Sequence, residues 1–202
     1  VYEKPNGDTK FIPVNTFVSV GGDYLQVDAG YRDHWFGPAA DSALLVSSNA
    51  PPPPSVTISN PVPLPFLDIR YEAYWARLSE QDAILSNQGR ELGNPKRIGL
   101  HLSMQPISGW TVGASRTLQY GGGSRPEDLS QLPEAIFYPS GADNIETGRP
   151  GQDPNDEFGD QQGAIHSALN IPGPFPVRAY FTLAGEDTSG SENYRFGNTA
   201  FT

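Results

Sequence analysis

Along much of this chain, apolar and polar side chains alternate one by one, which is the period of a β-strand. The segment from Phe66 to Arg77 shows it most clearly, with charges confined to one face over most of its length. The apolar face carries Leu67, Ile69, Tyr71, Ala73 and Trp75, and the other face carries Asp68, Arg70, Glu72 and Tyr74. Similar two-faced segments lie at residues 25–31, 97–105, 110–119 and 177–186. Residues 67–77 form a predicted strand of about the 9 to 11 residues that a tilted membrane strand needs.

Proline and glycine gather in short connections between these strands, at residues 21–23, 61–65, 106–109 and 172–176. Much longer polar stretches lie between these short connections, at residues 32–53, 80–95, 121–161 and from 188 onward. Successive connections of an up-and-down sheet fall at opposite ends. The alternation therefore places every short turn at one end and every long loop at the other. Outer-membrane barrels have this asymmetry, with periplasmic turns and longer extracellular loops.

We therefore predict an all-β fold, an antiparallel transmembrane β-barrel in which about eight strands form one partial barrel domain over residues 1–202, with no second domain. Eight strands suffice for a small barrel, but the long loops favour a portion of a larger one. Aromatic residues near strand ends fit either interfacial girdles or ordinary sheet positions.

Two local features modify this picture. In the loop after Gly121, the helical spacing of Leu129, Leu132, Ala135 and Ile136 predicts a short helix that begins near Asp128. Pro133 limits this helix to a few turns. Arg116 interrupts the apolar face of its strand, which indicates either a β-bulge or a position near the membrane interface.

Composition excludes several classes of function. The chain has 13 Lys and Arg against 23 Asp and Glu, a formal net charge of −10, and no basic cluster, so nucleic acid and anionic lipid surfaces are poor candidates as partners. It has no cysteine, which removes disulfides, thiolate metal sites and thiol nucleophiles. No apolar run approaches the roughly 20 residues of a membrane-spanning helix. The segment from Val1 has no signal-peptide pattern, so we expect any export signal to lie outside this sequence.

Candidate binding residues lie in the predicted long loops. Residues 31–38 combine two aromatic rings with a cation, a carboxylate and an imidazole, and Arg32, His34 and Trp35 are the sugar-binding candidates there. The alternative, which we favour for this segment, is that these side chains pack a loop folded into the barrel mouth. Both can hold together. Arg90, Arg125 and Tyr138 are the candidates in the other loops.

The residues needed for catalysis or metal binding do not form a recognisable pattern. His34, His101 and His166 lie on different predicted elements without ligand spacing, so we expect no metal site. The sequence contains no nucleophile elbow, and the adjacent Glu186 and Asp187 point to opposite faces of a strand. We therefore expect neither an enzyme nor a bound cofactor.

A series of short strings carries a resemblance to a known family. They begin with DYLQVDAGYR at residues 23–32 and include QYGGG at 119–123 and GEDTS at 185–189. The others lie at residues 34–35, 41–43, 54–57, 59–60, 109–110, 143–144 and 157–159. Together they resemble the Wzi family of outer-membrane capsule assembly proteins, in its enteric branch. The resemblance runs from about Asp23 to the C-terminus in the same order.

The resemblance implies an 18-stranded outer-membrane barrel with a periplasmic helical portion and a mouth occluded by loops, of which this chain lacks roughly the second half. It also implies a non-catalytic surface lectin that retains capsular polysaccharide. We thus expect a monomer in outer-membrane lipid, whose extracellular loops at residues 32–53, 80–95 and 121–161 hold the polysaccharide. The first alternative is a porin or transport channel lined by Asp68, Arg70, Glu72, Arg97 and His101. The second is a soluble β-sandwich glycosidase.

Overall fold

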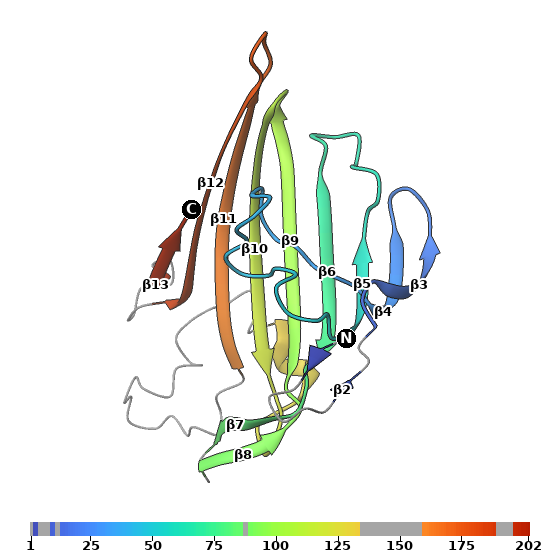
Figure 1. Cartoon of the computed structure of the whole chain (residues 1–202), viewed down its shortest axis with the longest axis vertical. Coiled ribbons are helices and arrows are strands. Elements are labelled where there is room, and N and C mark those ends of the chain that lie inside the picture. Colours follow the sequence, from blue (N-terminus) through green and yellow to red (C-terminus); the bar gives the residue numbers. More distant parts are fainter. Residues whose placement is uncertain (1, 4–8, 11–12, 87–88, 134–158, 189–195) are drawn as a thin grey trace.

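The computed structural model describes residues 2–3, 9–10, 13–86, 89–133, 159–188 and 196–202. Its described part forms one nine-stranded antiparallel sheet, in the order β13-β12-β11-β10-β9-β6-β5-β4-β3 (Figure 1). These strands are β3 (Thr16–Gly21), β4 (Gln26–Tyr31), β5 (Pro54–Ser59), β6 (Arg70–Arg77), β9 (Lys96–Ile107), β10 (Trp110–Tyr120), β11 (Gly159–Ile171), β12 (Val177–Thr188) and β13 (Phe196–Phe201). Two small hairpins stand apart from this sheet: β1 (Tyr2–Glu3) with β2 (Thr9–Lys10), and β7 (Gln81–Ser86) with β8 (Gly89–Gly93).

The predicted antiparallel all-β fold is confirmed, and so is the alternation of short and long connections. The short connections join β3 to β4, β5 to β6, β9 to β10 and β11 to β12. The long ones join β4 to β5, β6 to β9, β10 to β11 and β12 to β13. In Figure 1 the turns of β9–β10 and β11–β12 lie at the top, and the β7–β8 hairpin lies at the bottom. We call these the short-turn end and the long-loop end.

Three details differ from the sequence prediction. The main sheet has a ninth strand, β13, within the stretch after residue 188 that was assigned to a loop, and the loop at 80–95 contains the β7–β8 hairpin. The predicted strand from Leu67 begins only at Arg70. Leu67 and Asp68 have φ of 53° and 47°, a left-handed turn conformation that ends the extended run although the alternation continues through it.

The predicted loop helix is described only at its start. Leu129–Gln131 form a 3-10 turn, and the side chain of its N-cap, Asp128, accepts a hydrogen bond from the Ser130 amide at 2.9 Å. Ala135 and Ile136 lie outside the described residues. Within the described ranges, no helix is long and apolar enough to cross a membrane.

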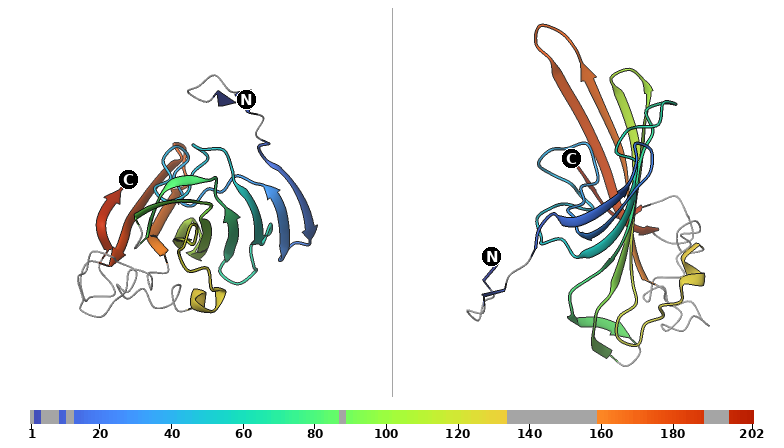
Figure 2. Two further views of the ribbon diagram at one scale, coloured as in Figure 1. Left: turned by 90° about the horizontal axis from the view of Figure 1, so that it is seen from below. Right: turned by 90° about the vertical axis from the view of Figure 1, so that its right-hand side faces the viewer.

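The sheet is curved (Figure 2), and its two faces differ in chemistry. The convex face is apolar and exposed, and its large exposed side chains include Val18, Val20, Val27, Val56, Ile58, Trp75, Leu102, Met104, Ile165, Leu169, Val177, Phe181 and Phe201. The concave face is polar and covered, and its buried side chains include Asp28, Ser55, Thr57, Ser59, Ser115, Thr117, His166 and Thr182. Soluble sheets bury their apolar face, whereas membrane barrels expose it to lipid.

The loop at residues 32–53 covers the concave face, and the 3-10 turn lies on the opposite side of the sheet (Figure 2, right). The main apolar cluster therefore lies between loop and sheet, where Phe36 and Val46 meet Tyr74 and Ala76. Tyr74 lies opposite Gly99 on β9, and a Cβ at Gly99 would collide with its ring. The absent side chain at position 99 is what lets this tyrosine lie flat against the wall.

Arg116 lies on the convex face, and its strand pairs there without a register shift on either side. Its guanidinium donates a hydrogen bond to the Gln161 amide oxygen. Close by, Leu118 and Tyr120 are buried on the same face, where Leu132 packs against them. The bulge alternative is therefore wrong, and a position of Arg116 near the membrane interface stays a prediction.

Candidate functional site

The loop at residues 32–53, which we call the plug loop, begins with a charged network on the concave face. The Arg32 guanidinium pairs with Asp28 on β4 and, at 3.0 Å, with Glu72 on β6. Gln26 also donates to Asp28, at 2.7 Å. The other Glu72 oxygen lies 2.7 Å from His34 Nδ1. A buried charge without a partner costs several kcal/mol of stability, and this arrangement gives each of these charges a partner.

Beyond His34 the plug loop crosses the concave face of the main sheet and contacts several of its strands in turn. The His34 ring stacks on Tyr74 of β6 with centroids 3.9 Å apart. Phe36 is 1% exposed and stacks on His101 of β9 at 5.3 Å. Farther along, Asp41 accepts a hydrogen bond from the Tyr180 hydroxyl of β12 at 3.3 Å. The plug loop therefore spans the wall from β4 to β12.

A second polar network lies beneath the plug loop. Ser115 Oγ is 2.8 Å from His101 Nδ1 and 2.7 Å from His166 Nε2, and His166 Nδ1 is 3.2 Å from the Thr182 hydroxyl. A hydroxyl has one proton, so Ser115 donates to one imidazole and accepts from the other. The sequence could not reveal this cluster, because it depends on the register that sets Ser115 against His101 and Gly113 against His166.

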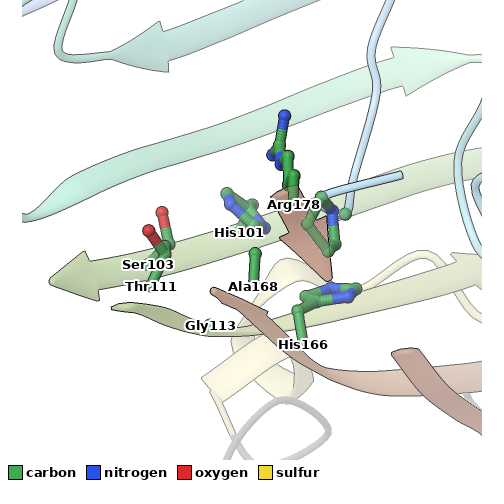
Figure 3. Close-up of a pocket in the computed structure, with 9 residues that line it drawn as sticks. His101, Ser103, Thr111, Gly113, His166, Ala168 and Arg178 are labelled. Carbon is green, nitrogen blue, oxygen red and sulfur yellow. The ribbon is translucent and has the colours of Figure 1, made fainter. Parts of the chain in front are cut away.

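A pocket of about 130 Å³ adjoins the two histidines (Figure 3). Its polar lining on the sheet also includes Ser103, Thr111 and Arg178, and Gly37 and Pro38 of the plug loop contribute to its wall. In the described part of the chain, no group of three or more His, Asp or Glu side chains could hold a metal ion.

A separate polar surface forms at the long-loop end. The Ser124 amide and hydroxyl donate to the Glu91 carboxylate of β8 at 2.6 and 2.8 Å. Glu127 accepts from the Gly122 amide at 3.1 Å and pairs with Lys96. The hydrogen bond from Lys96, together with that from the Gly122 amide, holds the pKa of Glu127 below its ordinary value. These contacts tie the β7–β8 hairpin to residues 121–127.

The predicted binding residues thus fall into two places. Arg32 and His34 lie inside, on the concave face, which agrees with the alternative of a loop folded into the barrel. Trp35 is half-buried, and its indole N–H donates to the Ala39 carbonyl at 2.8 Å. Arg90 is exposed on β8, and Arg125 lies on the segment bound to that strand. Tyr138 lies outside the described residues. A role in sugar binding stays a prediction for all six.

An apolar convex face, a polar concave face and an internal plug loop define the wall of an outer-membrane type of β-barrel. The sequence matches the family described as capsule assembly protein Wzi over residues 2–200, and the chain belongs to that family. The predicted resemblance to the family is confirmed.

A solved structure of Wzi from Escherichia coli has the same fold, with a TM-score of 0.69 and 20% sequence identity. The match covers 93% of this chain and 37% of that one, so this chain spans little more than a third of the solved protein. That Wzi is described as an outer membrane protein involved in group 1 capsule assembly and as a carbohydrate-binding β-barrel. Comparison with curated proteins gives no match.

Proposed function

We propose that this protein is an outer-membrane lectin, which binds capsular polysaccharide at the cell surface and anchors it there to support capsule assembly. The observation that carries the proposal is the plug loop. In a wall of the Wzi family, the chain itself occupies the polar concave face through Arg32, Glu72 and His34. The long-loop end is then the surface left for an extracellular ligand.

In this proposal the wall is part of an 18-stranded barrel, a monomer whose convex face contacts outer-membrane lipid and whose long loops face outward. Arg90 and Arg125 come from segments held together by the Ser124–Glu91 hydrogen bonds, and they donate to sugar hydroxyls and acidic groups. Each sugar contact is weak. A polymer repeats the same unit, so many weak contacts add up to stable retention.

The proposed role is non-catalytic. The serine and histidine pair most similar to that of a hydrolase is Ser115 with His166, but Ser115 is only 6% exposed. Its hydroxyl already bridges two imidazoles beneath the plug loop. A nucleophile has to reach its substrate, and this geometry supports a packing role for the pair.

The test is binding of purified capsular polysaccharide to the intact protein in detergent, together with capsule retention on cells. The double variant R90A/R125A should bind at least about tenfold more weakly, because each arginine contributes charge-assisted hydrogen bonds. Arg70→Ala is the matched control, since Arg70 is an exposed arginine at the short-turn end and should leave binding unchanged. Equal binding by R90A/R125A and the unmodified protein would remove this surface from the site.

The porin alternative is tested separately. A channel needs an open lumen, whereas the described concave face is covered by the plug loop. In planar lipid bilayers we expect no steady conductance from the intact protein. Steady open channels would overturn the occluded lectin in favour of a pore.

A further inference from the structure

The pocket beneath the plug loop lies at a different place from the long-loop surface. Thr111 and Arg178 are each the second residue of their strand after a short turn, in β10 and β12. The pocket therefore belongs to the short-turn half of the wall. Arg90 and Arg125 lie at the opposite end, so the pocket is a separate candidate site.

The pocket has a cation without a counterion. Among the described residues Arg178 makes no ion pair or hydrogen bond, and no carboxylate lines the pocket. Of the carboxylates in the neighbouring networks, Glu72 is ion-paired with Arg32 and His34, and Asp41 accepts a hydrogen bond from Tyr180. In a chain of net charge −10, this is a local site for an anionic group.

The rest of the lining provides neutral hydrogen-bonding groups and space. Ser103 and Thr111 offer hydroxyls, and the Nε2 atom of His101 makes no hydrogen bond within the described ranges. Space comes from Ala168 and from two glycines, Gly37 and Gly113. Gly37 has φ of 129°, a conformation that other residues rarely adopt, so the backbone itself keeps this wall free of a side chain.

We propose that this pocket is a separate subsite for a single free carboxylate-bearing sugar, such as a uronate. The Arg178 guanidinium receives the carboxylate in a two-pronged contact, and the hydroxyls of Ser103 and Thr111 with the His101 imidazole contact the ring hydroxyls. The pocket volume of about 130 Å³ has room for one sugar unit. The subsite lies at the end opposite the proposed polymer surface, so it goes beyond the proposed lectin function and does not depend on it.

Calorimetric titration of the intact protein in detergent tests this, with sodium glucuronate as the probe and glucose as its neutral counterpart. Glucuronate should bind and glucose should bind at least about tenfold more weakly, because only glucuronate has the charge that Arg178 pairs with. Arg178→Gln should reduce glucuronate binding to the level of glucose. Arg77→Gln is the matched control, because Arg77 lies at the long-loop end, where it donates to Asn94 at 3.1 Å.

A second variant addresses the space in the pocket without touching its charged or hydrogen-bonding groups. Ala168→Leu places a larger apolar side chain in the lining and should abolish glucuronate binding while Arg178 is intact. Inorganic phosphate serves as the competing oxyanion. Phosphate binding as tight as that of glucuronate would overturn the sugar assignment and leave a general anion site.

The outcomes separate the subsite from the proposed function. If glucuronate binds equally to Arg178→Gln and to the unmodified protein, the pocket is not its site. If the polymer binds with dependence on Arg90 and Arg125 but glucuronate does not bind at all, the subsite is overturned and the lectin stands. Glucuronate binding that requires Arg178, without any binding of polymer, would support the pocket and overturn the lectin.

Discussion

Ile165 and His166 are neighbours on β11 and have opposite surroundings. The isoleucine is 49% exposed on the convex face, whereas the histidine is 7% exposed on the concave face, bonded to Ser115 and Thr182. In a soluble protein this would leave the apolar residue in water and bury the polar one. The difference supports the proposal that lipid contacts the convex face. On the concave face, the histidine is hydrogen-bonded by side chains of the two neighbouring strands beneath the plug loop.

The largest effect should come from a charge on the lipid face. Ile165→Arg places a cation in the middle of β11. It should lower the free energy of unfolding by about 2–4 kcal/mol, which is the cost of an arginine near the bilayer midplane. Heat-modifiable migration of the protein folded into lipid vesicles measures the folded fraction. Gln162→Arg on the concave face of the same strand is the control and should fold nearly normally. Equal folding of both variants would contradict the assignment of the two faces.

A smaller effect is expected from weakening the plug loop. Glu72→Gln replaces the carboxylate that Arg32 and His34 share with a neutral amide, and should destabilise the seated loop by about 2 kcal/mol. The readout is the rate of protease cleavage within residues 32–53, together with bilayer conductance. Asp41→Asn, at the longer contact with Tyr180, should change the cleavage rate little. A cleavage rate in Glu72→Gln no different from that of the unmodified protein would mean that this network does not hold the loop.

The smallest effect concerns pH at the long-loop end. The pKa of Glu127 is lower in the folded protein than its ordinary value of 4.5, mainly because of the hydrogen bond from Lys96. The resulting stabilisation is therefore present above about pH 4.5 and is lost as the pH falls through the folded-state pKa. It is less than about 1 kcal/mol, because the side chain is half exposed.

Hydrogen exchange at the Gly122 amide, which donates to Glu127, measures this local stability. Protection should decrease on acidification from pH 6 to about pH 3, and Glu127→Gln should exchange faster at pH 6 and lose this pH response. Asp82→Asn on the β7–β8 hairpin is the control. If Glu127→Gln showed the same pH response as the unmodified protein, other groups would be responsible for that response.

Much of the sheet could be predicted because apolar and polar residues alternate with a period of two in most of its strands. Leu102 and Ser103, for example, differ in polarity and lie on opposite faces of the sheet. Other features depend on information that no single strand contains. Leu67 and Asp68 continue the alternation although their backbone turns, and β13 is too short and polar for a clear pattern.

The candidate site was less predictable than the fold. Residues 31–38 could be recognised as a cluster because they are contiguous. The direction in which the Arg32 side chain points could not, because it depends on Asp28 of β4 and Glu72 of β6. The pocket draws its lining from β9, β10, β11 and β12 and from the plug loop. Only the register of these strands brings Arg178 and His101 to one place.

The path of the plug loop also sets an order of events in folding. Asp41 meets Tyr180 across 139 residues of sequence, so the loop cannot complete its seat until β12 has been made and paired. Contacts of such long separation form late, because the intervening chain must first be ordered. Until then the surface against which the loop packs is incomplete. In the proposed barrel, closure of the lumen would thereby be tied to completion of the wall, and an unfinished barrel would be left unsealed.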